Sequence, residues 1–273
     1  MIWGVFDSGV GGLTVVRELR RQLAAAPLVY LGDTARVPYG IRSRETVRRY
    51  AEEAARFFVD AGVDGVIVAC NTASAVALDV FETIFGGPVL GVVEPGVRAA
   101  LARTRGGSIG VIGTAATIRS DAYARRIREI SPGTGVASMA CPLFVPLAEE
   151  GWVDGEVPSL VARHYLAPLH DAGVDTLILG CTHYPLLRPV VSRVMTGAVL
   201  VDSAEAVASE ARTFAERIRG GREGEAQSAA GMAAGRSRFC VTDAGGAFAN
   251  IAGRFLGDPS VELEVVTLGP GSR

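Results

Sequence analysis

The sequence of 273 residues contains no lysine, so all 27 of its basic side chains are arginines. A lysine amine is required for a pyridoxal-phosphate Schiff base, for imines with carbonyl substrates, and for phosphate loops of the GKS or GKT type. The missing lysine therefore excludes all three kinds of chemistry from this chain.

Histidine and cysteine are also scarce. Three histidines leave little room for a multi-histidine metal site, and we expect no metal. The four cysteines include no CxxC pair, which is typical of reduced thiols and not of a disulfide scaffold or a zinc site. They are Cys70, Cys141, Cys181 and Cys240.

The chain lacks a large net charge and long hydrophobic runs. Its formal charge of −2 gives no electrostatic footprint for nucleic acid. No apolar run reaches about 18 residues, and the N-terminus has no basic n-region, so we expect a cytoplasmic protein with neither membrane span nor signal peptide. Hydrophobic residues make up 49% of the chain, which is typical of a globular protein, and the length favours two domains or one large α/β unit.

Short apolar segments that end in Gly, Ser, Thr, Asn or Asp alternate with helical patterns. Their continuous Val, Ile and Leu content is typical of strands buried on both faces of a parallel sheet. The sequence therefore predicts an α/β fold. The expected strands are Ile2–Phe6, Leu28–Leu31, Gly65–Ala69, Val89–Val93, Ser108–Ile112, Gly135–Met139, Thr176–Leu179 and Ala198–Val201.

Two helices and one loop are also predicted. One helix runs from Ser43 as N-cap to Gly62, and another runs from about Glu156 to Ala172 and contains Pro168, which should kink or split it. The stretch Arg219–Arg238 is rich in Gly, Ala and Ser without a periodic face, which indicates a mobile surface loop. One more strand and one more helix follow it, at Phe239–Asp243 and Gly246–Leu256.

An internal repeat organises the chain. Ala61–Thr72 and Ala172–His183 align without gaps, and the alignment superimposes Cys70 on Cys181. A single copy would be a common sequence pattern at a helix-to-strand connection, but two copies with matched cysteines favour a true repeat. We predict two similar parallel-sheet α/β lobes, related by a pseudo-twofold axis, with the active site between them. The first lobe would comprise residues 1–96 plus 207–273, and the second residues 97–206.

Cys70 and Cys181 both fall at the carboxyl end of a predicted strand, which is the edge where open α/β sheets bind ligands. The N-terminus of a following helix lowers the pKa of a thiol and attracts a carboxylate. If the lobes face each other, two thiols reach one ligand from opposite sides. This suits the removal of a proton from one face of a stereocentre and its return to the other. For Cys141 and Cys240 we keep the usual interpretation of small buried hydrophobes.

Polar residues gather near the same strand ends. Asp7 leads a glycine-rich turn without GxGxxG spacing, so it fits an ammonium group or a nearby thiol, and an N-cap role is equally open. His183 could support the Cys181 thiolate as an imidazolium, and Glu149 could orient that imidazole or be a solvated loop residue. Further rim residues are Asp33, Tyr39 and Gly40.

Five motifs, taken in order, extend over nearly the whole chain. They are DSGVGGLT at Asp7–Thr14, GDTARVPYG at Gly32–Gly40, CNTAS at Cys70–Ser74, PLFVPLAEEG at Pro142–Gly151 and LGCTHYPLL at Leu179–Leu187. Through these five motifs the sequence resembles the glutamate racemases, which are cofactor-independent two-cysteine enzymes of the aspartate/glutamate racemase superfamily.

The resemblance implies interconversion of L- and D-glutamate, which supplies D-glutamate for peptidoglycan, without metal, nucleotide or other cofactor. Cys70 and Cys181 would be proton donor and acceptor, with Cys70 acting on the D face and Cys181 on the L face. The glutamate site would be lined by Asp7, Ser8, Tyr39, Gly40, Asn71, Thr72, Thr182 and His183. Thr114 and Thr117 would contact a carboxylate, and Asp33 and Glu149 would assist the thiols.

Three other functions stay open. They are a racemase of another acidic amino acid such as aspartate, a two-lobed amino-acid binding protein, and an acyl hydrolase built on Cys181 and His183. The last is disfavoured because residues two apart on a strand or loop tip rarely aim both side chains at one point. The expected partner is the small-molecule substrate glutamate, with no nucleic acid and no membrane, and a homodimer is left open.

Overall fold

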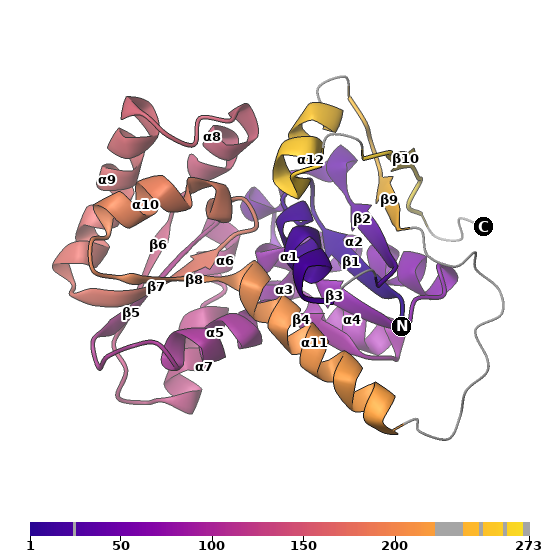
Figure 1. Ribbon diagram of the computed structural model, residues 1–273, viewed down its shortest axis with the longest axis horizontal. Helices are drawn as coiled ribbons and strands as arrows, with labels where there is room; N and C mark the ends of the chain where they lie inside the picture. Colours follow the sequence, from indigo (N-terminus) through magenta and orange to yellow (C-terminus); the bar gives the residue numbers. More distant parts are fainter. Residues whose placement is uncertain (24–25, 222–236, 246–247, 259–260, 270–273) are drawn as a thin grey trace.

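The computed structural model describes residues 1–23, 26–221, 237–245, 248–258 and 261–269, and these form two α/β lobes (Figure 1). Each lobe is built on one parallel sheet with helices on both faces, as the buried Val, Ile and Leu segments predict. Across the described ranges, no helix has both the length and the apolar content that a membrane span requires.

The first sheet has six strands in the order β10-β9-β2-β1-β3-β4. One face packs against α1 (Leu13–Leu23), α11 (Ser203–Gly221) and α12 (Phe248–Leu256), and the other against α2 (Arg44–Asp60), α3 (Asn71–Val76) and α4 (Leu78–Phe85). The strands are β1 (Trp3–Asp7), β2 (Leu28–Gly32), β3 (Gly65–Val68), β4 (Val89–Gly91), β9 (Arg238–Val241) and β10 (Glu264–Val265).

The second sheet has four strands in the order β6-β5-β7-β8. One face packs against α8 (Phe144–Glu150), α9 (Glu156–Asp171) and α10 (Arg188–Val194), and the other against α5 (Val93–Leu101) and α7 (Ala122–Ile130). The strands are β5 (Ser108–Gly113), β6 (Val136–Ala140), β7 (Val174–Gly180) and β8 (Val199–Asp202), and the short helix α6 (Ala115–Arg119) follows β5.

The strand orders support the predicted repeat. The run β2-β1-β3-β4 in the first sheet has the same arrangement as β6-β5-β7-β8 in the second, so that β3 corresponds to β7. Cys70 follows β3 and Cys181 follows β7, each at the carboxyl end of its strand. The proposed lobe limits, at residues 96/97 and 206/207, fall inside α5 and α11 and stay a prediction.

The structure corrects three details of the sequence analysis. Helix α9 continues through Pro168 to Asp171, so the predicted split is wrong. Pro168 has no N–H to donate, but its carbonyl still accepts a hydrogen bond from Ala172 N at 3.1 Å. Helix α11 continues to Gly221 and β9 begins at Arg238, so both ends of the predicted loop are regular structure. The rest of that loop, residues 222–236, lies outside the described residues. Strand β10 was not predicted, because two residues carry no periodicity.

Other details agree with the prediction. Ser43 caps α2 by accepting a hydrogen bond from Thr46 N at 3.2 Å, and Gly62 follows the helix with a φ of +63°. The additional strand predicted after the loop is β9, which pairs with β2 on the first lobe. The helix expected after it is α12, and residues 246–247 at its predicted start lie outside the described residues.

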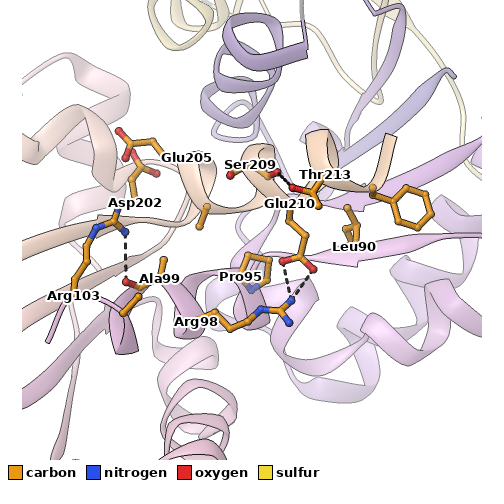
Figure 2. Close-up of a pocket in the computed structure, with 13 residues that line it drawn as sticks. Leu90, Pro95, Arg98, Ala99, Arg103, Asp202, Glu205, Ser209, Glu210 and Thr213 are labelled. Carbon is orange, nitrogen blue, oxygen red and sulfur yellow. Dashed lines mark hydrogen bonds and ion pairs between the residues drawn. The ribbon is translucent and has the colours of Figure 1, made fainter. Parts of the chain in front are cut away.

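The chain passes between the lobes twice, through α5 after β4 and through α11 after β8. Arg98 on α5 makes a bidentate ion pair with Glu210 on α11, at 2.7 and 2.8 Å. A cavity of about 700 Å³ lies between these helices (Figure 2). Neither Cys70 nor Cys181 lines this cavity, so it is separate from the residues that carry the predicted chemistry.

Candidate active site

A cavity of about 40 Å³ lies between the two lobes and is lined by both thiols. Of the residues expected to line the glutamate site, all except Asp7 line it, and they come from four separate segments of the chain. Thr114, which was expected to contact a carboxylate, also lines it, whereas Thr117, Asp33 and Glu149 do not. The lining residues are Ser8, Val37, Pro38, Tyr39, Gly40, Cys70, Asn71, Thr72, Thr114, Val145, Cys181, Thr182 and His183. The structure therefore brings Cys70 and Cys181 to one place, as the repeat predicts.

The Cys70 half of the cavity is neutral or negative in character. The Cys70 thiol is buried and donates a hydrogen bond to Ser8 Oγ at 3.4 Å. Burial, with a further contribution from the charge of Asp7, raises the pKa of Cys70 to about 12. The thiol is therefore protonated at neutral pH and is suited to donate a proton.

Asp7 lies behind the cavity wall and not on it. It is buried, and burial raises the pKa of its carboxyl group. It accepts a hydrogen bond from Gly9 N at 3.0 Å, as a turn-capping residue does, and one from Thr182 Oγ1 at 3.4 Å. Asp7 thus fixes the glycine-rich turn and links the first lobe to the Cys181 half of the site.

The Cys181 half contains a positive charge. Cys181 Sγ lies 3.8 Å from His183 Nδ1, and His183 Nε2 lies 3.0 Å from Glu149 Oε1. Burial alone disfavours an imidazolium, but the hydrogen bonds to Cys181 and Glu149 outweigh it and raise the pKa of His183 to about 10. At neutral pH a cation therefore lies beside the Cys181 sulfur.

The structure brings Cys181 and His183 together, as the expected support of the Cys181 thiolate by His183 requires, although residues at this spacing rarely converge. Strand β7 ends at Gly180 and the chain turns at once, with Tyr184 N donating to Cys181 O at 3.1 Å. In such a turn the side chains of two residues that are two positions apart can point to the same side of the chain. The resemblance to the glutamate racemases also implied a role for Glu149. Its carboxylate lies 3.0 Å from His183 Nε2 and orients that imidazole.

Tyr39 is held from behind by Asp33. The Tyr39 hydroxyl donates a short hydrogen bond to Asp33, which also accepts from Arg36 Nε at 2.7 Å and Thr242 Oγ1 at 3.0 Å. Burial and the Asp33 charge raise the pKa of Tyr39, so it stays a hydrogen-bond donor. Asp33 therefore accepts hydrogen bonds behind Tyr39 and does not line the cavity that contains the thiols.

Hydroxyl and amide groups also join the lobes. Thr72 Oγ1 lies 2.9 Å from Thr114 Oγ1 and 3.1 Å from Thr117 Oγ1. Asn71 Oδ1 accepts from Tyr123 OH at 2.6 Å, so part of its amide is already satisfied by the second lobe. These contacts therefore hold the lobes in register, and Asn71, Thr72 and Thr114 also line the cavity.

Two glycines permit the close approach of the lobes. A Cβ added at Gly11 would lie 2.1 Å from Thr182 Oγ1 and 2.5 Å from His183 Nδ1. A Cβ at Gly40 would lie 2.6 Å from the Cβ of Thr114. All three distances are shorter than real Cβ contacts, so a side chain at either position would force the facing residues of the other lobe to move.

The sequence analysis missed the apolar part of the cavity wall. Val37, Pro38 and Val145 lie inside motifs that were noticed for their polar residues, and an apolar loop residue gives no chemical signal of its own. Cys141 and Cys240 are buried and line no part of this cavity, in agreement with their interpretation as packing residues.

The family model for Asp/Glu/hydantoin racemases matches residues 4–211, a span that includes both cysteines and every other cavity residue. The chain belongs to this family. The resemblance noted in the motifs is thereby confirmed, and the protein is an enzyme of the racemase class.

Individual relatives match almost the whole chain. The glutamate racemase of Geobacter metallireducens is 51% identical over 266 residues, which cover 97% of this chain and 96% of that protein. A solved structure of glutamate racemase from Francisella tularensis, in complex with D-glutamate, has a TM-score of 0.88, 36% identity and 97% coverage of both chains. The Thermus thermophilus enzyme, in complex with β-chloro-D-alanine, has a TM-score of 0.82 and 45% identity, covering 97% of this chain and 96% of its own. Both neighbours confirm the two-lobed α/β fold.

Proposed function

We propose that the protein interconverts L- and D-glutamate by a two-thiol mechanism and so supplies D-glutamate for peptidoglycan. The observation that carries the proposal is the presence of Cys70 and Cys181 on one interlobe cavity, at the ends of corresponding strands. The high identity to glutamate racemases over nearly the full chain supports glutamate as the substrate.

In this proposal short neutral donors hold the substrate. Ser8, Thr72, Thr182 and the backbone at Gly40 line the cavity, while no arginine does. Such groups bind a carboxylate at a fixed distance and leave unpaired buried donors when the substrate is shorter. Asp7, close behind the wall, provides a negative charge for the substrate ammonium group.

The proton transfers follow from the positions of the two thiols. For L-glutamate, the Cys181 thiolate removes the Cα proton, and the electron pair is delocalised into the α-carboxylate as an enediolate. The Cys70 thiol then donates its proton to the opposite face of Cα, which gives D-glutamate, a Cys70 thiolate and a Cys181 thiol. The reverse reaction exchanges the two roles, so no net proton is gained or lost.

The surroundings of the thiols fit the start of this cycle in the L-to-D direction. The pKa of Cys70, raised to about 12, keeps a proton available for donation. His183 Nδ1 lies 3.8 Å from the Cys181 sulfur, and Glu149 holds the other ring nitrogen at 3.0 Å, which keeps the imidazole oriented toward this thiol. No external group is needed to create the acid and base.

Incubation of the protein with L-glutamate in D₂O tests the proposal directly. We expect the α-proton signal to disappear from the NMR spectrum without any added cofactor, together with formation of D-glutamate. A binding protein or an acyl hydrolase would leave the α-proton in place. The Cys181–His183–Glu149 arrangement resembles a hydrolase triad, but a triad has no use for the second thiol.

The substrate assignment has its own test. Aspartate is shorter by one methylene and would leave part of the donor set unpaired, so we expect kcat/KM for aspartate to be lower by about 100-fold or more. Equal turnover of aspartate and glutamate would contradict the substrate assignment while leaving the thiol mechanism intact.

A further inference from the structure

Asn71, which lines the catalytic cavity, is held by two side chains that reach it from the second lobe. Tyr123 on α7 donates its hydroxyl proton to Asn71 Oδ1 at 2.6 Å. Ser203, the first residue of α11, has its Oγ 3.4 Å from Asn71 Nδ2. All three side chains are buried, so water does not compete for these contacts. The amide is therefore held by two groups that do not line the cavity themselves.

The direction of these hydrogen bonds is determined by Ser203. A serine hydroxyl carries one proton, and the Ser203 hydroxyl donates it to the backbone carbonyl of Leu179 at 3.2 Å. Toward Asn71 the Ser203 oxygen can then only accept, so it faces the NH₂ group of the amide. The carbonyl oxygen of the amide faces Tyr123, and burial raises the pKa of Tyr123, which keeps this hydroxyl protonated as the donor. The hydrogen bonds thus allow one orientation of the amide and exclude the rotated one.

This orientation leaves one N–H group of Asn71 for a ligand. The Nδ2 atom carries two N–H groups, and one of them is directed to Ser203. The other meets no acceptor among the residues that the structure describes, and the side chain borders the catalytic cavity. An amide rotated by half a turn would offer its carbonyl oxygen in place of this N–H, and a carbonyl oxygen repels a carboxylate.

We propose that Tyr123 and Ser203 are positioning residues, which orient the amide of Asn71 so that it donates an N–H to a carboxylate of the substrate. The inference rests on the proposed function, since the carboxylate is that of glutamate. It gives the second lobe a part in substrate binding through a residue of the first lobe. When the lobes separate, the amide loses both partners and its fixed direction, so contact between the lobes and affinity for the substrate are coupled.

The orientation can be observed by NMR, because the chain contains two asparagines, Asn71 and Asn250. Protein labelled with ¹⁵N in asparagine gives two side-chain amide groups, and the exposed Asn250 is the internal control. We expect the Asn71 amide protons to exchange with solvent at least about ten-fold more slowly than those of Asn250. Saturation with racemic glutamate, whose composition the enzyme cannot change, should shift one Asn71 proton strongly and the other weakly. Exchange as fast as that of Asn250, or equal shifts of both protons, would overturn the proposal.

Kinetics of variants test the effect on binding. Tyr123→Phe and Ser203→Ala should each raise KM for glutamate by about ten-fold and change kcat by about two-fold at most. In an Asn71→Ala background, which has no amide to orient, Tyr123→Phe should cause no further change in KM. A merely structural role of the hydroxyl would persist in that background. The matched control is Tyr165→Phe, which removes a second-lobe hydroxyl that accepts from Leu143 N at 3.4 Å outside the cavity, and its KM should equal that of the wild type.

Failure of this inference and failure of the proposed function give different results. An unchanged KM in Tyr123→Phe, or an equal rise with and without the Asn71 amide, would overturn the positioning role and leave the racemase function intact. Absence of glutamate racemisation by the wild type would contradict the proposed function. In that case the exchange rates and shifts of the Asn71 protons still decide whether the amide is held in one orientation and donates to a carboxylate.

Discussion

The two halves of the catalytic cavity share a fold position and differ in electrostatics. Cys70 and Cys181 follow corresponding strands in sheets of the same strand order. Yet Cys70 is buried near the carboxylate of Asp7, while Cys181 lies beside the imidazolium of His183. A repeat can therefore place two identical groups symmetrically while the residues around them differ, and in the proposed mechanism this difference sets which thiol starts as the acid.

Replacement of either thiol of the proposed proton-transfer pair should have the largest effect. Cys70→Ser and Cys181→Ser each remove one proton carrier, and we expect racemisation to fall by about 10³-fold. Cys141→Ser, which changes a buried thiol outside the cavity, should stay active. Racemisation is measured by polarimetry of glutamate.

The two serine variants should differ with a glutamate analogue that carries a β leaving group. Elimination needs only one thiolate, so Cys181→Ser should still act on the D analogue and Cys70→Ser on the L analogue. Identical enantiomer preference in both variants would contradict the assignment of faces. Near wild-type racemisation by Cys70→Ser would contradict the two-thiol mechanism itself.

Removal of the positive charge beside Cys181 should have the next largest effect. We expect His183→Gln to lower kcat by about 100-fold, because Cys181 loses its neighbouring cation. The two enantiomers have equal free energies, so kcat/KM must stay equal in the two directions. Any asymmetry between the halves must therefore be sought in the separate kcat values.

The pH dependence of the same pair sharpens the comparison. His183 has a folded pKa raised to about 10 from an ordinary value of 6.5, so its stabilising contribution is complete below pH 6.5 and is lost as the pH rises through 10. The difference in unfolding free energy between wild type and His183→Gln should shrink over this range. Glu149→Gln removes the negative charge beside the imidazolium and keeps an acceptor oxygen, and the alkaline limb of the activity profile should then move to lower pH. A limb unchanged in Glu149→Gln would show that Glu149 does not support the charge.

A methyl group at Gly11 should disturb one half more than the other. The added Cβ of Gly11→Ala would collide with Thr182 and His183, so we expect racemisation and elimination from the L analogue to fall by about ten-fold, with elimination from the D analogue less affected. Gly133→Ala is the matched control, because a Cβ there meets no atom within 4 Å. Equal losses with both enantiomers would place the disturbance outside the Cys181 half.

Chelation should have no effect. If protein groups alone create the difference between the thiols, exhaustive treatment with EDTA leaves kcat unchanged and the protein shows no visible pyridoxal absorbance. Loss of activity that zinc or magnesium restores would mean that a metal, and not His183, polarises one half of the site.

Much of the fold could be predicted because its signals are local. Buried parallel strands are continuous apolar segments, and the cap at Ser43 follows from hydrogen-bonding chemistry at a helix start. The matched cysteines could be found because they repeat. The proximity of Cys181 and His183 was a hypothesis from their spacing, but the turn that brings the two side chains together leaves no periodic signal in the sequence. The interlobe partners of Asn71 and Thr72 also escaped prediction, because they come from segments distant in the sequence.

The first sheet is completed by strands from the far end of the chain. Strand β9 pairs with β2, and the neighbouring loops are joined by a hydrogen bond between Thr34 and Asp243, 209 residues apart. The four strands of the second sheet form one continuous stretch. During synthesis on a ribosome, the second lobe therefore emerges whole and can fold early, while the first lobe must wait for nearly the entire polypeptide. A chain truncated by a premature stop before β9 would thus carry the Cys181 half on a completed sheet and the Cys70 half on an open edge, exposed to aggregation.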